Sequence, residues 1–130
     1  MLKLTYTESG LRLERLGLSL EVWIAQRVTL MLRAGQKLYV EPSTASFLLD
    51  ARQPGLLRLE KLLSQEYKSR IAIAPAEAGM VEVSLPGSWI AECSDAHEGL
   101  FVTGCSDAVE LCLYRLWHVA QKQASFLALE

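Results

Sequence analysis

Hydrophobic and polar residues alternate at the start of the chain, which predicts a β-hairpin. Leu2, Leu4 and Tyr6 fall at every second position, and Leu11 and Leu13 resume the alternation after a polar turn. Because successive side chains of a strand point to opposite faces, these five apolar side chains are expected to share one face of the hairpin.

A helical period follows the hairpin. Ser19 offers a side-chain oxygen that can cap a helix, and Glu21 suits the positive end of the helix dipole. Apolar residues then recur every three or four positions, at Leu20, Trp23, Ile24, Val28, Met31 and Leu32. Gly35 is the expected end of this helix, since glycine readily adopts the left-handed conformation that ends helices.

The middle of the chain carries weaker signals. Residues 37–41 predict a strand that Pro42 ends. Residues 43–49 could form one helical turn or irregular backbone. Pro54 suits the first position of a helix, and a leucine-rich helix is expected from there to Leu63.

From Arg70 onward the period shortens to two, which predicts several short strands. They are expected around residues 71–73, 81–85, 89–93 and 100–103. Pro86 and Gly87 predict a tight turn between the second and the third of these strands.

The predicted pairing of these strands places Trp89. With a tight turn at residues 86–87, and with Cys93 opposite Leu100, Trp89 falls on the sheet face opposite to that of Phe101. That second face is mixed in polarity, so we expect Trp89 to be partly exposed. A bulge at the turn would shift the register by one residue and exchange the faces.

The last helix shows the most extensive apolar pattern. It runs from Asp107, which forms a capping box with Glu110, to about Ala124. The apolar positions in and after it are Val109, Cys112, Leu113, Leu116, Trp117, Val119, Ala120, Ala124 and Leu127. They cover about half of the circumference, more than the roughly 100° of an ordinary surface helix. We expect this helix to be buried on two sides, by its own sheet and by a second copy of the chain.

Strands and helices are mixed without a regular βαβ alternation, which predicts an α+β fold. A mainly antiparallel sheet, made of the N-terminal hairpin and a C-terminal meander, is expected to be packed by two or three helices. The long C-terminal helix is one of these. No repeat, low-complexity tract or linker interrupts the chain, so residues 1–130 are expected to form a single domain.

Charge and composition limit the choice of partners and compartment. The 13 basic and 15 acidic residues are interspersed, which argues against a nucleic-acid partner. No apolar stretch approaches the roughly 20 residues of a membrane span, and the first residues do not read as a signal peptide. We therefore expect a cytoplasmic protein with no membrane partner. Cys93, Cys105 and Cys112 include no Cys-x-x-Cys pair and are expected to be buried thiols.

A polar segment at residues 41–46 is the candidate site for an anion or a small molecule. If a helix begins there, Ser43, Thr44 and Ser46 could bind a phosphate or carboxylate at its N-terminus. The alternative is that Ser43 or Thr44 caps its own helix. No glycine-rich cradle or lysine accompanies these hydroxyls, so the segment is not a P-loop.

Two further polar clusters carry weaker hypotheses. Asp95, His97 and Glu98 include metal-ligating groups, but they crowd into one short turn that we interpret as solvated. His118 falls on the polar side of the last helix, where a solvated residue is the better interpretation. We expect no metal site, no cofactor and no catalytic residue, and the sequence does not indicate an enzyme.

Three segments, residues 4–8, 13–16 and 40–49, resemble a small family of conserved, uncharacterised cyanobacterial proteins. The resemblance implies a cyanobacterial origin and a soluble protein. It implies no activity, ligand or catalytic residue.

The sequence thus favours a non-catalytic, soluble protein-interaction domain that forms a homodimer and binds a protein partner of unknown identity. The expected interface contains Trp89, Val119, Phe126 and Leu127. The alternative is a small-molecule or anion-binding domain that uses the segment from Glu41 to Ser46. A third possibility is an enzyme without a recognisable motif.

Overall fold

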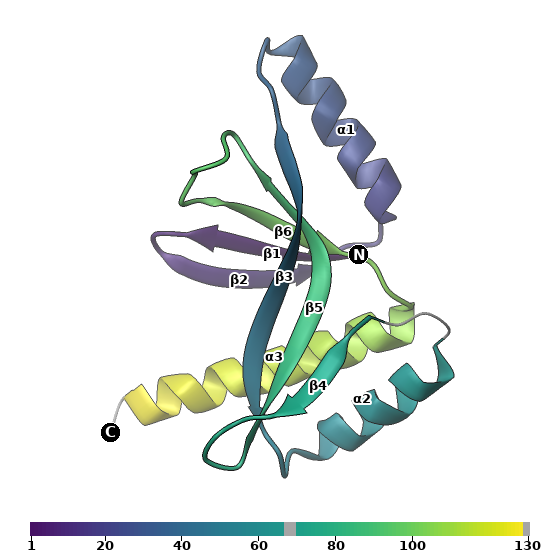
Figure 1. The fold of residues 1–130 in the computed structure, drawn as a ribbon, viewed down its shortest axis with the longest axis vertical. Helices are drawn as coiled ribbons and strands as arrows, with labels where there is room; N and C mark the ends of the chain where they lie inside the picture. The colour runs from purple at the N-terminus through teal and green to yellow at the C-terminus, as the bar shows by residue number, and fades with distance from the viewer. Residues whose placement is uncertain (67–69, 129–130) are drawn as a thin grey trace. The chain divides into compact units, whose positions relative to one another are not determined.

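The computed structural model has the expected α+β fold, with an antiparallel sheet and a long C-terminal helix (Figure 1). It describes residues 1–66 and 70–128, without the side chains of residues 123–128. In chain order the elements are β1 (Leu2–Thr7), β2 (Gly10–Arg15), α1 (Leu20–Arg33), β3 (Tyr39–Asp50), α2 (Pro54–Gln65), β4 (Ala72–Pro75), β5 (Met80–Ala91), β6 (Gly99–Thr103) and α3 (Asp107–Ala128). The strands follow the order β2-β1-β6-β5-β3, and β4 also pairs with β5.

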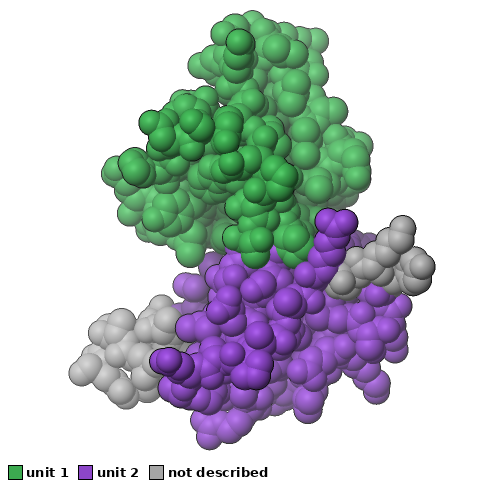
Figure 2. Space-filling model, viewed as in Figure 1, with its two compact units in different colours: residues 1–44, 86–104 green, residues 45–85, 105–130 purple. Residues whose placement is uncertain are grey.

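The chain forms two compact units, coloured green and purple in Figure 2. Unit 1 contains residues 1–44 and 86–104, and unit 2 contains residues 45–85 and 105–130. The chain therefore passes from one unit to the other three times, and two of these passages lie within strands β3 and β5. A single domain over residues 1–130 stays a prediction.

The predicted N-terminal hairpin is confirmed in unit 1. Leu4 lies opposite Leu13 and Tyr6 opposite Leu11, so the apolar side chains share one face. The other edge of β1 pairs with β6. Helix α1 contributes Trp23 to a buried cluster on the opposite sheet face, together with Met1, Ile90 and Val102. Part of the core of unit 1 thus forms between α1 and the sheet, and Leu2, Leu13 and Phe101 are buried on the other sheet face.

The predicted ends of α1 are also confirmed. The Ser19 side-chain oxygen accepts a hydrogen bond from the backbone N–H of Val22, at 3.3 Å. Gly35 has a φ of 71°, the left-handed conformation expected just beyond a helix end.

Unit 2 is built on the packing of α2 against α3, with β4 beside the first half of β5. Pro54 occupies the start of α2, as predicted. Gly55 follows it, and a Cβ atom at Gly55 would lie 2.8 Å from Leu116 Cδ2. The missing side chain therefore allows the two helices to approach closely at this point.

Helix α3 begins at Asp107 as predicted, but the side chain that caps it belongs to the preceding residue, Ser106. The Ser106 hydroxyl, and not the Asp107 carboxylate, accepts a hydrogen bond from the N–H of Val109, at 3.3 Å. The Ser106 N–H donates to the carboxylate of Glu66, at 2.9 Å. Glu110 is buried, and its carboxylate accepts a 3.4 Å hydrogen bond from the N–H of Cys105. Two carboxylates thus accept the N–H groups that precede the helix.

The prediction that Pro42 ends a strand is wrong. Strand β3 continues to Asp50, so residues 43–49 are neither a helical turn nor irregular backbone. Proline lacks the N–H that a central strand needs, and it is therefore confined largely to edge strands. Because β3 lies at the end of the strand order, it can include Pro42 without losing a bond to a second neighbour.

The predicted tight turn at Pro86 and Gly87 is also wrong, because β5 runs through both residues. The Pro86 carbonyl accepts a 2.8 Å hydrogen bond from the side-chain hydroxyl of Thr103. The Phe101 ring and the Val102 carbonyl occupy the space where a Gly87 side chain would lie. Pro86 and Gly87 therefore fit this strand through contacts with β6.

The corrected strand changes the predicted register. Leu100 pairs with Ile90 and not with Cys93, a shift of three residues, and Trp89 lies opposite Phe101. Because directly opposed residues share a face, the assignment of Trp89 to the face away from Phe101 is wrong. Trp89 is nevertheless partly exposed, as expected. Its ring lies close to Gly99, where a Cβ atom would be 2.5 Å from Trp89 Cζ2.

We predict that Gly87→Ala lowers the free energy of unfolding by about 1–3 kcal/mol, the usual cost of overpacking. The new Cβ would lie 2.3 Å from the Val102 carbonyl oxygen and 2.6 Å from Phe101 Cζ. Gly17→Ala is the control, because a Cβ there meets nothing within 4 Å. Urea unfolding measures both variants, and equal stabilities for the two would contradict the close packing of β5 and β6.

Candidate functional site

The residues proposed for anion binding lie in a strand. Ser43, Thr44 and Ser46 belong to β3, so the helix N-terminus that motivated this site does not exist. The Ser46 hydroxyl lies 3.1 Å from the Ser84 hydroxyl of β5 and forms a hydrogen bond with it. The segment from Glu41 to Ser46 thus contributes to a strand, and its anion-binding hypothesis loses its structural basis.

The polar turn after β5 lines an open hollow of about 560 Å³ in unit 1. His97 and Glu98 lie along it, as do Trp23 and Arg27 of α1. The Arg27 guanidinium lies 5.2 Å from the centre of the Trp23 ring, within range of a cation–π interaction. The Glu98 carboxylate accepts a long 3.4 Å hydrogen bond from the N–H of Glu8. Among the residues whose side chains the structure describes, no group of three or more His, Cys, Asp or Glu residues lies close enough together to hold a metal ion.

His118 is not the solvated residue that the sequence suggested. Its ring is partly buried and meets the Tyr114 ring edge-on, with the centroids 4.4 Å apart. The Trp117 ring lies 5.4 Å away, also edge-on. His118 Nε2 is buried and has no hydrogen-bond partner. His118 therefore packs among aromatic rings of its own helix.

The three cysteines are free, but they differ in exposure. Cys112 is buried as predicted, Cys105 is partly buried, and Cys93 is exposed. The prediction of burial is therefore wrong for Cys93, which follows the end of β5. A hydrogen bond to the Asp95 carboxylate is the main cause that raises the pKa of the Cys93 thiol.

The wide apolar stripe of α3 is largely used within the chain. Its buried members are Val109, Cys112, Leu113, Leu116 and Trp117. Val119 is 41% exposed, and Trp89 in unit 1 is partly exposed. Phe126 and Leu127 belong to the part of α3 whose side chains lie outside the described residues. The surplus that suggested a second partner for α3 is thus mostly intrachain core.

Helix α1 instead has an apolar row that its own unit does not bury. Val22, Ala25, Thr29 and Leu32 recur at intervals of three, four and three residues, so they line up along one side of the helix. We call these four residues the outer seam. All four are exposed, Val22 by 45% and Leu32 by 67%. The seam faces away from Leu20 and Ile24, which pack against the core of unit 1.

The outer seam is free of charge and of unsatisfied hydroxyl groups. The Thr29 hydroxyl donates a 2.9 Å hydrogen bond to the carbonyl of Ala25, within the helix itself. A shallow hollow of about 420 Å³ lies over Ala25, Gln26, Thr29 and Leu30. The sequence analysis placed Leu32 in one helical row with Leu20 and Ile24, but Leu32 is 67% exposed and lies in the outer seam instead. The outer seam is therefore the candidate interaction surface of unit 1.

The contact between Asp95 and Cys93 predicts how fast Cys93 is alkylated. Asp95→Asn removes the carboxylate that raises the pKa of the thiol, so the pKa should fall and more thiolate should be present at pH 8. We expect iodoacetamide to modify Cys93 several-fold faster in this variant, as measured by peptide mass spectrometry. Buried Cys112 serves as the internal reference, and an unchanged Cys93 rate would disprove the contact.

Comparisons place the chain in a family. Within the described residues, no helix combines the length and hydropathy needed to cross a membrane. Neither the curated proteins nor the solved structures include a match to this chain. The match to the Alr0857-like family extends over residues 1–121, nearly the whole chain, and the protein therefore belongs to the Alr0857-like family.

Proposed function

We propose that the protein is a non-catalytic interaction domain that forms a homodimer through the outer seam of α1. The observation that supports this proposal is the exposed, uncharged apolar row of Val22, Ala25, Thr29 and Leu32. Exposed apolar surface of this kind marks association sites in soluble proteins. A helix with apolar rows on two opposite sides gains from burying both.

The arrangement of side chains in the seam favours a second copy as the partner. The larger residues, Val22 and Leu32, stand at its ends, and the smaller Ala25 and Thr29 stand between them. When two such helices pair antiparallel about a twofold axis, Val22 of each copy meets Leu32 of the other. Ala25 then meets Thr29, so the same surface is complementary to itself, as a twofold dimer requires.

Charges at the two ends of α1 favour the same antiparallel pairing. Glu21 lies in the first turn and Arg33 in the last turn. Antiparallel pairing brings the acidic end of one helix near the basic end of the other, and it also opposes the two helix dipoles. Parallel pairing would instead place like charges at the same end.

The expected dimer is weak. Stable protein interfaces bury about 800 Å² on each partner, and a single row along one helix offers less. We therefore expect association in the micromolar range, with concentration-dependent dissociation. The competing location for the interface is the one predicted from the sequence on α3, at Val119, Phe126 and Leu127, of which only Val119 has a described side chain and is exposed.

We further propose a cytoplasmic location in a cyanobacterium. An exposed thiol such as Cys93 persists most easily in a reducing compartment, and the resemblance of residues 4–8, 13–16 and 40–49 to cyanobacterial proteins supports the organism class. A protein partner beyond the second copy would use the same exposed apolar surface.

We predict that Leu32→Glu weakens self-association at least tenfold, because it places a charge in the seam of each copy. Glutamate is a good helix former, so α1 itself should persist. Sedimentation velocity from 1 to 200 μM measures the dimer constant. Thr29→Leu should have the opposite effect, because it adds apolar surface at the centre of the seam.

Two control variants separate this interface from others. Leu57→Glu changes a residue that is 73% exposed on α2, and it should leave association unchanged. Val119→Glu tests the competing location on α3. A wild-type protein that stays monomeric at 200 μM would overturn the homodimer, and dissociation by Val119→Glu alone would move it to α3.

A further inference from the structure

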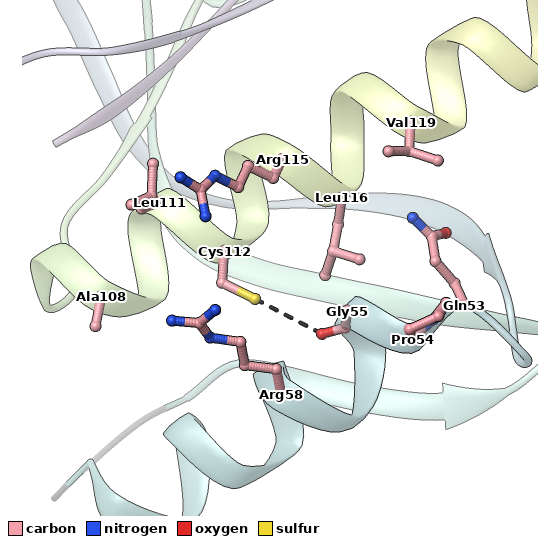
Figure 3. Close-up of a pocket in the computed structure, with 10 residues that line it drawn as sticks. All are labelled: Gln53, Pro54, Gly55, Arg58, Ala108, Leu111, Cys112, Arg115, Leu116 and Val119. Atoms are coloured by element: carbon pink, nitrogen blue, oxygen red, sulfur yellow. Dashed lines mark hydrogen bonds between the residues drawn. The ribbon is translucent and has the colours of Figure 1, made fainter.

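A pocket of about 440 Å³ opens between α2 and α3 of unit 2 (Figure 3). Its walls are Gln53, Pro54, Gly55, Arg58, Ala108, Leu111, Cys112, Arg115, Leu116 and Val119. This volume lies within the range of about 300–1,000 Å³ that is typical of small-molecule sites. The pocket belongs to a different unit from the outer seam of α1, so it requires a separate explanation.

A close contact between the two helices borders the pocket. Gly55 has no side chain and allows the contact with Leu116. At the same place the Cys112 thiol donates a 3.7 Å hydrogen bond to the Gly55 carbonyl, the dashed line in Figure 3. The contact of Gly55 with Leu116 and Cys112 therefore forms one boundary of the pocket.

The two ends of the pocket differ in polarity. Figure 3 shows the guanidinium groups of Arg58 and Arg115 pointing toward the end near Ala108, from facing helices. Leu116, Val119 and Pro54 lie toward the other end. A molecule that fills the pocket lengthwise therefore meets positive charge at one end and apolar surface along the rest.

The pocket carries positive charge from two arginines. None of the described residues that line it is acidic. Within the part of the chain that the structure describes, neither Arg58 nor Arg115 has an ion-pair partner. Burial raises the pKa of the Cys112 thiol, and the positive charges of Arg58 and Arg115 oppose that rise. Their field thus reaches the interior of the pocket.

The apolar end contains one unsatisfied polar atom. Gln53 Oε1 is buried and has no hydrogen-bond partner. The Gln53 side chain does not cap α2, although it precedes the first turn. A buried acceptor without a partner is costly, so a monocarboxylate whose far end carries a hydroxyl group should bind more tightly than one whose far end is a methyl group.

We propose that this pocket binds an amphiphilic monocarboxylate, such as a fatty acid. Its carboxylate would lie between Arg58 and Arg115, since guanidinium groups match carboxylate geometry with paired hydrogen bonds. Its hydrocarbon chain would lie along Leu116 and Val119. The proposal rests on the pocket of unit 2 alone and does not require the dimer.

Titration calorimetry with dodecanoate, below its micelle concentration, tests the proposal. The wild-type protein is expected to bind one dodecanoate per chain and to bind dodecanol at least tenfold more weakly. Arg58→Met and Arg115→Met keep the apolar stem of each side chain but remove its charge. Each should weaken dodecanoate binding at least tenfold and leave dodecanol binding unchanged. Lys61→Met removes a positive charge from the same helix, outside the pocket, and should change neither.

Two more measurements test the apolar part of the pocket. In the series octanoate, decanoate and dodecanoate, each added CH₂ group should tighten binding about fourfold, as expected for burial of a methylene. Val119→Trp should fill the apolar end and abolish binding, and circular dichroism would show that the variant folds. Leu32→Glu should bind dodecanoate like the wild type, because the outer seam is in unit 1.

Three results would overturn the proposal. One is the absence of dodecanoate binding by the wild-type protein. Another is equal affinity for dodecanoate and dodecanol, which would show that Arg58 and Arg115 do not select a carboxylate. The last is equally tight binding of inorganic phosphate, which would show a simple anion site without a role for the hydrocarbon chain.

Discussion

The close contact between Gly87 of β5 and the residues of β6 is the constraint on which the sheet of unit 1 depends. The Phe101 ring and the Val102 carbonyl occupy the side of Gly87, and Thr103 supplies a hydroxyl to the Pro86 carbonyl. These contacts allow β5 to pass through a Pro-Gly pair without turning. They also fix Trp89 opposite Phe101, and they leave Ile90 and Val102 on the face where α1 packs. The core of unit 1 follows from this register.

The parts of the fold that could be predicted from sequence are those decided by near neighbours. Ser19 caps α1, Gly35 ends it and Pro54 starts α2, and each works through backbone groups within a few residues. Pro42 and Pro86 were misread because their local preference is for a break. An edge position for β3 and a hydroxyl from Thr103 override that preference, and both come from residues far away in the sequence.

Helical periodicity predicted how much apolar surface each helix has, but not what covers it. Much of the α3 stripe is buried within the chain, with Leu113 inaccessible to solvent and Gly55 of α2 against Leu116. The outer seam of α1 contains fewer large apolar residues, yet Val22 and Leu32 in it are 45% and 67% exposed. A wide stripe therefore did not by itself indicate a partner molecule. Only the folded structure shows which apolar row of a helix is left exposed to solvent.

The pocket of unit 2 could not be predicted from sequence, because each of its charged residues looks ordinary in isolation. Arg58 and Arg115 stand far apart in the chain, and the sequence around each reads as a solvated helix face. The protein as a whole has a formal charge of −2, which favours no anionic ligand. Two of its carboxylates form ion pairs away from the pocket, Glu14 with Arg12 at 3.0 Å and Asp50 with Arg52 at 3.2 Å. What a site attracts depends on the charges that face it more than on the net charge of the protein. Two arginines facing an apolar pocket can therefore select an anion on a protein whose net charge is negative.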